Sequence, residues 1–293
     1  MIKYIKRSDL DTAKYNACLD NSSNSRIYAY SWYLDIVATN WSVLVLDDYT
    51  AVMPLPWRQK YLIKYIYKPC WVQQLGVFSP NIIDEELVRT FISAIPRMYK
   101  KISIQLNSNN PISGKRITKK ANYILELDKS YEELFNGYKS VRRRNIRLSI
   151  KNKIIVSRSE NYVELINLFK TIKKDEVSTR EEDYLKLEQL IHFLIENNKV
   201  DVLKAVGENG ELLGGAFFLR DIKRITYLFS VVSNIGREQN AMSDIIDSMV
   251  EKSANKNLTL DFEGSMIDGI AFFFKSFGAM DEGYCLYQVS KII

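Results

Sequence analysis

The chain has 293 residues, of which 46% are hydrophobic and 26% charged, a composition typical of a globular protein with room for two domains. Its three cysteines, Cys18, Cys70 and Cys285, stand singly, which argues against a disulfide framework and a zinc cluster. No stretch reaches the roughly 18 uncharged apolar residues that span a bilayer, and the amino terminus lacks an apolar core of signal-peptide length. We therefore expect a cytoplasmic protein without a metal.

The positive charge is concentrated in one segment. The formal net charge is +6, and seven basic residues but no acidic one lie between 139 and 153. The rest of the chain therefore carries one net negative charge. This distribution indicates a local anionic partner rather than a surface that coats nucleic acid.

The first half alternates strand and helix patterns. Turn residues Asp47 and Asp48 join two strands, and acidic residues open a later helix. In chain order we expect a strand at the start, helices at 8–18 and 28–37, strands at 41–46 and 51–56, an aromatic stretch at 61–78, a helix at 84–95 and a strand at 101–106.

The second half repeats this order of elements at an offset of roughly 155 residues. We expect a strand at 154–156, helices at 162–174 and 183–197, a hairpin of 202–206 with 212–219, a strand at 225–232, a helix at 243–252, a strand at 258–260 and a helix at 270–277. Two copies of one α/β domain are the simplest interpretation.

The basic segment forms an amphipathic pattern if it is helical. One side carries Tyr138, Val141, Asn145 and Leu148, and the other carries Arg143, Arg144, Arg147 and Lys151. Arginine forks bind phosphate in a bidentate manner, so a nucleotide-linked or lipid-linked diphosphate acceptor, or tRNA, is a natural partner. A solvated basic helix without a ligand is the alternative.

The strand at 225–232 is apolar and β-branched, as in a strand buried on both faces. A polar loop follows it, and Ser243 is a candidate N-cap for the next helix. The N-terminus of a helix that begins beyond the carboxyl end of a buried strand presents unpaired N–H groups, which can hold an anion.

Three segments, 225–232, 258–264 and 269–278, resemble the second domain of the Fem peptidoglycan aminoacyltransferases, within the wider GNAT N-acyltransferase fold. The resemblance implies an α/β (α+β) protein of two tandem GNAT-like domains, each with a central mixed twisted sheet flanked by helices. The first domain, residues 1–127, would be degenerate and support the substrate groove. The second, residues 128–293, would hold the transfer site.

In the GNAT fold the loop after this strand receives the pyrophosphate of acyl-CoA. The family signature there is Arg or Gln, two residues, Gly, one residue, then Gly or Ala, whereas Arg237 is followed by Asn240 and Met242. The Fem branch also lacks this signature and uses aminoacyl-tRNA, so acyl-CoA and aminoacyl-tRNA both stay open as donors. The residues expected to bind the donor are Val231, Val232, Gly236, Arg237, Asn240 and Ser243.

The resemblance also implies catalytic residues. Lys275, on an aromatic helix, would stabilise the oxyanion in a water-poor site, and Glu263 or a water held by Asp261 would collect the proton. Tyr227 and Tyr284 are expected to contact substrate. The alternatives are that the two carboxylates cap the next helix and that Lys275 is a lysine extending to solvent.

The sequence thus predicts an enzyme that moves an acyl or aminoacyl group to an amine, on a cell-envelope or polysaccharide precursor. One rival is an acyl-CoA-dependent N-acetyltransferase acting on an amino sugar or lipid. Another is a non-catalytic tandem module that binds RNA or an anionic partner. A Ser-His-Asp hydrolase is disfavoured because the chain has one histidine, His192, and no Gly-flanked serine nucleophile.

Overall fold

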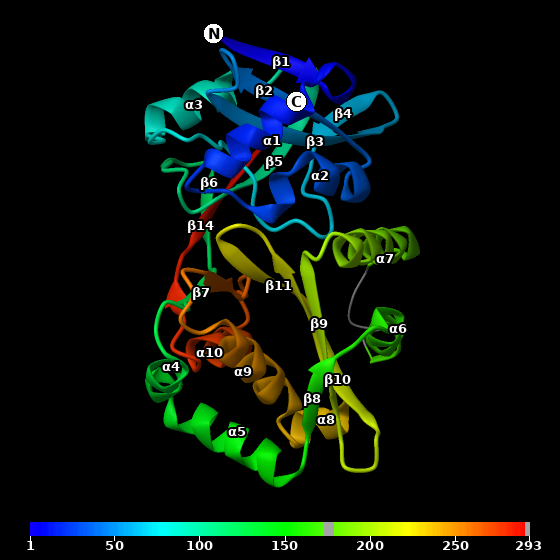
Figure 1. Ribbon diagram of the computed structural model, residues 1–293. Coiled ribbons are helices and arrows are strands. Elements are labelled where there is room, and N and C mark those ends of the chain that lie inside the picture. The colour runs from blue at the N-terminus through cyan, green and yellow to red at the C-terminus, as the bar shows by residue number, and fades with distance from the viewer. Residues whose placement is uncertain (173–178, 291–293) are drawn as a thin grey trace. The chain divides into compact units, whose positions relative to one another are not determined.

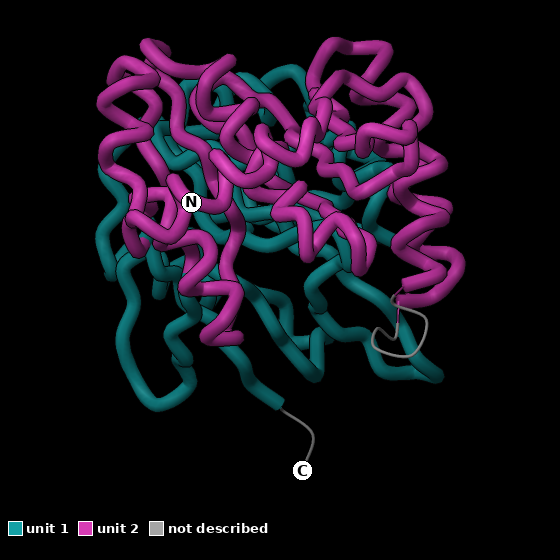
Figure 2. Tube along the Cα trace, turned by 90° about the horizontal axis from the view of Figure 1, so that it is seen from below, with its two compact units in different colours: residues 1–121, 282–293 teal, residues 122–281 magenta. Residues whose placement is uncertain are grey.

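The computed structural model describes residues 1–172 and 179–290, and the chain divides into two compact units (Figure 2). Unit 1 comprises Met1–Ala121 and Glu282–Ile293, and unit 2 comprises Asn122–Asp281. Each unit has its own seven-stranded mixed sheet flanked by helices, so the predicted fold class is confirmed. Among the described residues, no helix is both long enough and apolar enough to cross a membrane.

The two units do not follow the expected ranges 1–127 and 128–293. The last strand, β14 (Tyr284–Ser290), pairs with β5 (Tyr99–Leu106) and β6 (Ile117–Lys120) in the sheet of unit 1. The chain therefore passes from unit 1 to unit 2 and back. A linear reading of repeated elements could not show this return, because pairing between strands so distant in sequence leaves no local pattern.

Unit 1 is built on a sheet with strand order β1-β2-β3-β4-β5-β14-β6, in which only β4 and β5 run parallel. Asp84 caps α3 by accepting from the Leu87 amide, and α3 buries Val88 and Phe91 in the core. The remaining elements of this unit are β1 (Ile2–Lys6), α1 (Thr12–Asn21), α2 (Ser31–Val37), β2 (Asn40–Leu46), β3 (Ala51–Lys60), β4 (Ile63–Ile66) and α3 (Glu85–Ser93).

Unit 2 has the strand order β13-β7-β12-β11-β10-β9-β8, with β11 and β12 parallel. Figure 1 shows α6 and α7 on one face of this sheet and α9 on the other. The predicted helix at 162–174 is α6, and its expected end at 174 lies outside the described residues. The elements are β7 (Tyr123–Glu126), α4 (Tyr131–Gly137), α5 (Ser140–Lys151), β8 (Ile155–Arg158), α6 (Tyr162–Ile172), α7 (Glu181–Glu196), β9 (Val200–Val206), β10 (Leu212–Arg220), β11 (Arg224–Val232), α8 (Asn234–Glu238), α9 (Ala241–Ser253), β12 (Thr259–Asp261), α10 (Asp268–Lys275) and β13 (Met280–Asp281).

The basic segment is helical, as α5, but the side of the helix that carries Val141, Asn145 and Leu148 is not the side that is buried. Arg142, Ile146 and Ser149 are buried against the rest of unit 2, whereas Leu148 is 40% exposed. The helix is rotated relative to the apolar pattern because the Arg142 guanidinium finds hydroxyl acceptors and aromatic rings inside the unit.

Candidate functional site

The sheet of unit 2 opens between β11 and β12. These parallel strands pair only over Arg224–Thr226 and Thr259–Asp261, while β11 continues to Val232 beside β10. Beyond Thr226, no described strand pairs with the β12-facing edge of β11. A bulge between Phe217 and Phe218 of β10 leaves Leu228 of β11 without an opposite residue, and bulges of this kind recur next to active sites.

A cavity of about 700 Å³ lies beside the open part of β11. Apolar side chains form most of its wall, and the polar side chains come from α5, α8, the start of α9 and the open part of β11. Its lining consists of Arg142, Asn145, Phe169, Ile172, Ser230, Val231, Val232, Gly236, Arg237, Asn240, Met242, Ser243, Ile267, Gly269, Ile270 and Phe273. All six residues expected to bind the donor are in this set.

The loop between β11 and α9 is shaped by a side-chain cap and by two backbone constraints. Ser233 caps α8 by accepting from the Gly236 amide at 3.0 Å. A Cβ on Gly236 would lie 2.1 Å from the Leu213 carbonyl oxygen, so only glycine lets α8 approach β10 this closely. Asn240 has a φ of 66°, the left-handed conformation that asparagine tolerates.

The prediction that Ser243 caps α9 is wrong. The helix begins earlier, because the left-handed Asn240 ends α8 and is itself the N-cap of α9, without a side-chain hydrogen bond to the first turn. Ser243 is buried within that turn, and its hydroxyl accepts a hydrogen bond from Arg142.

Arg142 is the functional candidate that the sequence reasoning missed. Its Nε donates to the Ser276 hydroxyl at 2.9 Å, and its guanidinium lies 4.1 Å from the centre of the Phe273 ring. It is 4% exposed. Nothing in the sequence separates it from the six other basic residues nearby, since its burial depends on the helix rotation.

A buried tyrosine lies behind the cavity wall, in contact with Met242. The Tyr227 hydroxyl donates to the Met242 sulfur at 3.1 Å, and its ring packs against Phe262 and Phe274. Burial raises the pKa of Tyr227, so its hydroxyl keeps its proton at neutral pH. Tyr227 is not part of the cavity wall, but it supports a residue that is.

Asp261 is a buried carboxylate, and both of its oxygens accept hydrogen bonds within unit 2. Its Oδ1 accepts from Asn122 at 3.0 Å and from the Glu263 amide at 2.9 Å, and its Oδ2 accepts from Arg224 at 2.9 Å. It is 1% exposed. Hydrogen bonds from three donors leave it little capacity to hold a water for catalysis.

The water-poor environment expected for Lys275 is also wrong. Lys275 ends α10 with an exposed side chain, and its Nζ lies 5.1 Å from the centre of the Tyr123 ring. Glu263 is half-buried with a φ of 57°. Neither residue lines the cavity, because the apolar face of α10 points Ile270 and Phe273 toward it.

The other predicted substrate contacts lie away from the cavity wall. Arg143 donates to the carbonyl oxygens of Asn136 and Tyr138, at 2.7 and 2.6 Å, and so ties α5 to the end of α4. Arg144 and Arg147 are exposed on α5. Tyr284 is buried in β14 and belongs to unit 1.

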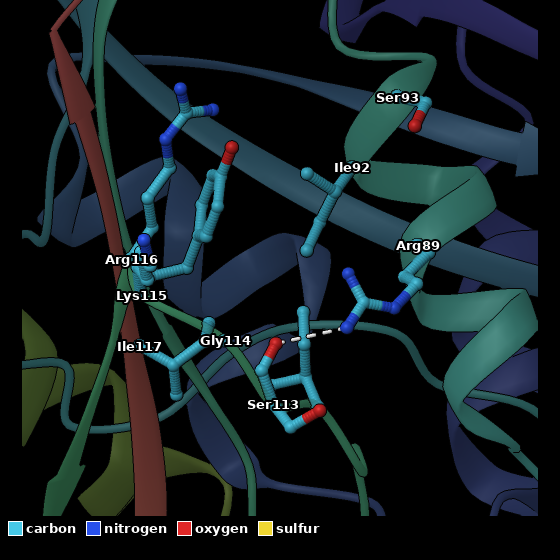
Figure 3. Close-up of a pocket in the computed structure, with 10 residues that line it drawn as sticks. Arg89, Ile92, Ser93, Ser113, Gly114, Lys115, Arg116 and Ile117 are labelled. Carbon is cyan, nitrogen blue, oxygen red and sulfur yellow. Dashed lines mark hydrogen bonds between the residues drawn. The ribbon is translucent and has the colours of Figure 1, made fainter.

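Unit 1 has a shallower cavity of about 400 Å³ between α3 and the segment before β6 (Figure 3). Arg89 reaches across it to the Ser113 carbonyl oxygen at 2.9 Å and also pairs with Glu85. Lys115 and Arg116 at its rim are exposed. We regard this cavity as a weaker candidate, since its buried wall holds no polar group directed at a ligand.

Two acidic residues of α9 give a prediction about stability. Burial raises the pKa of both Asp244 and Asp247 to about 6, and Asp247 accepts from the Tyr131 hydroxyl at 2.8 Å. A carboxyl with a raised pKa holds its proton more tightly in the folded state, so unit 2 loses stability as the pH rises from about 4 to about 6. Asp247→Asn keeps a side-chain oxygen that can accept the hydrogen bond from Tyr131, but it removes the negative charge.

We therefore expect Asp247→Asn to raise the melting temperature at pH 7.5 and to flatten its dependence on pH between 4 and 6. The gain is bounded by about 3 kcal/mol, from roughly two pKa units at 1.36 kcal/mol each. Circular-dichroism melts across this pH range measure it. A variant that melts lower than wild type at pH 7.5 would show that the charge at Asp247 is stabilising.

The comparisons with known proteins bear on the fold. The structure is similar to that of FemX, with a TM-score of 0.70 at 14% identity, covering 98% of this chain and 97% of that one. The structure is also similar to that of L-PGS from Bacillus licheniformis, with a TM-score of 0.57 at 11% identity, covering 97% of this chain and 93% of that one. An acetyltransferase of the GNAT family from Colwellia psychrerythraea has a TM-score of 0.54 at 13% identity, covering 99% of this chain and 100% of that one. No protein-family model matches the sequence, and no curated protein matches it. The chain thus has a Fem-like, GNAT-type fold.

Proposed function

We propose that this protein is a cytoplasmic acyl- or aminoacyltransferase that moves an acyl group to an amine, and that the cavity of unit 2 is its transfer site. The observation that supports this most is the divergence of β11 from β12, which leaves an edge of β11 that no described strand pairs with, beside a largely apolar cavity. An extended acyl donor can lie along such an edge, because main-chain groups hold it while the cavity excludes water.

The reaction requires little from the protein beyond binding and orientation. The acceptor nitrogen attacks the carbonyl carbon of a thioester or ester, the new C–N bond forms, and the C–S or C–O bond breaks. The nitrogen loses a proton, and the leaving sulfur or oxygen takes one up. The neutral Tyr227 hydroxyl is a buried donor on the open part of β11, and it can assist the leaving group after release from Met242.

For the donor, we propose aminoacyl-tRNA ahead of acyl-CoA. Met242 occupies the first turn of α9 where the GNAT signature has Gly or Ala, and its side chain lines the cavity. A phosphate approaching these amides meets the thioether. The exposed Arg144 and Arg147 of α5 suit the phosphates of tRNA or of a nucleotide-linked or lipid-linked acceptor, on a cell-envelope or polysaccharide precursor.

Coenzyme A is therefore expected to stabilise the wild-type protein weakly or not at all in a thermal-shift titration, since only ligands that bind the folded state raise the melting temperature. Met242→Ala should increase the shift by removing the obstruction. A sub-micromolar dissociation constant of wild type for acetyl-CoA would reverse the preference between the two donors.

Transfer itself is tested by incubating the protein with labelled acyl-CoA or aminoacyl-tRNA and a panel of nucleotide-linked and lipid-linked amines. The proposal expects a labelled, base-stable amide product with one donor class. Tight, salt-dependent binding of tRNA without any product would instead support the binding-module alternative.

A further inference from the structure

The cavity of unit 2 contains a buried cation held in a fixed orientation. Two of the three guanidinium nitrogens of Arg142 are committed, Nε to the Ser276 hydroxyl and Nη1 to the Ser243 hydroxyl. The group also lies over two rings, 4.1 Å from the centre of Phe273 and 4.6 Å from that of Phe277. These contacts leave Nη2 as the one nitrogen without an acceptor among the described residues.

The charge of Arg142 is not compensated inside the unit. Its hydrogen-bond acceptors are neutral hydroxyls, and no carboxylate of the described chain pairs with it. Burial lowers the pKa of Arg142 to about 10, so the group is still charged at neutral pH. An unpaired charge removed from water is costly, and an anion that enters the cavity relieves that cost.

A second feature of the cavity also favours an anion. The Ser243 hydroxyl that accepts from Arg142 lies in the first turn of α9, a 13-residue helix whose N-cap side chain makes no hydrogen bond to that turn. The positive end of the helix dipole therefore acts on the same region as the guanidinium. The other cation of the wall, Arg237, is exposed.

We propose that the cavity of unit 2 binds its ligand through a carboxylate on an apolar skeleton, with the carboxylate on Nη2 of Arg142 and the skeleton against Phe169, Ile172 and Ile270. A carboxylate fits better than a phosphate, because the buried cation of the wall offers a single uncommitted nitrogen, the second cation, Arg237, is exposed, and the rest of the wall is mostly apolar. The inference rests on the proposed function for the ligand's role as a transfer substrate, but not for its binding.

Calorimetric titration of the full-length protein with octanoate, octanol and octyl phosphate tests the proposal without requiring a known substrate. Octanoate is expected to bind wild type at least about tenfold more tightly than octanol, the effect of one charge-assisted hydrogen bond. Equal binding of octanoate and octanol would overturn the proposal, and so would tighter binding of octyl phosphate than of octanoate.

Substitutions of single arginines then test which guanidinium binds the carboxylate of octanoate. Arg142→Met should weaken octanoate binding about tenfold or more, and Arg142→Lys should recover part of it. Arg158→Met, which removes an exposed arginine from β8 of the same unit, should have no effect. Loss of binding in Arg237→Met with retention in Arg142→Met would contradict the assignment. The comparison of ligands on wild type stands even if Arg142→Met does not fold.

The outcomes also separate this inference from the proposed function. Amide formation in the transfer assay without preferential octanoate binding would leave the transferase proposal standing and refute the carboxylate site. Preferential octanoate binding that depends on Arg142, without transfer from any donor, would support the site and count against the transferase.

Discussion

Replacing Gly269 with Trp is expected to lower acyl transfer about a hundredfold or more while leaving the fold intact. Gly269 lies in the first turn of α10 and lines the cavity, and a Cβ built on it meets no atom within 4 Å. The indole can therefore enter the cavity without distorting the backbone. A displacement of about 1 Å in the reacting groups already costs on the order of a hundredfold in rate.

Gly269→Ala is the matched control for this variant. Alanine adds only the Cβ, and it should keep the activity and lose no stability, because alanine is a better helix former than glycine. Initial rates and circular-dichroism melts of both variants provide the measurement. Wild-type turnover in Gly269→Trp would show that the cavity is not the transfer site.

Asp261→Ala is expected to destabilise unit 2 by about 3–5 kcal/mol, the usual cost of breaking a buried ion pair by removing one partner. The substitution leaves the buried Arg224 without the Asp261 carboxylate and takes away the acceptor of Asn122 and of the Glu263 amide. A loss of activity in this variant then follows from lost structure.

A loss of activity in Asp261→Ala can come from lost structure in unit 2 or from a lost catalytic group, and the positions of the tryptophans allow the two causes to be distinguished. All four lie in the first half of the chain, at Trp32, Trp41, Trp57 and Trp71, within unit 1. Urea unfolding followed by fluorescence therefore reports on unit 1, whereas circular dichroism reports on both units. An earlier dichroism transition alone places the damage in unit 2, and an inactive variant as stable as wild type would return Asp261 to a catalytic role.

The sequence was sufficient for most of the elements of unit 2 and for the position of the polar loop after β11. Alternation and β-branched runs predicted the hairpin of β9 and β10 and the strand β11. The six residues expected to bind the donor lie at the end of β11 and in the loop and helix that follow, and all of them line the cavity, while donor binding by them stays a prediction. These features are local, and local periodicity carries them.

The errors arose where distant segments decide the outcome. Which face of α5 is buried depends on the hydroxyls of Ser243 and Ser276, which accept hydrogen bonds from Arg142 and lie more than 100 residues after it in the sequence. These contacts keep Arg142 buried. Likewise, Asp261 looks like a free carboxylate until Arg224 and Asn122 are placed beside it. No pattern within a single segment contains these pairings.

Reversible blocking of the cavity of unit 2 tests whether acyl transfer takes place there. Ser230 lines the cavity on the open part of β11, and Ser230→Cys treated with benzyl methanethiosulfonate places a benzyl group there through a disulfide. We expect labelled amide formation to stop on treatment and to return after dithiothreitol, while wild type treated in the same way, with its own exposed Cys70, stays active. Undiminished transfer by the fully modified variant would show that the reaction does not take place in this cavity.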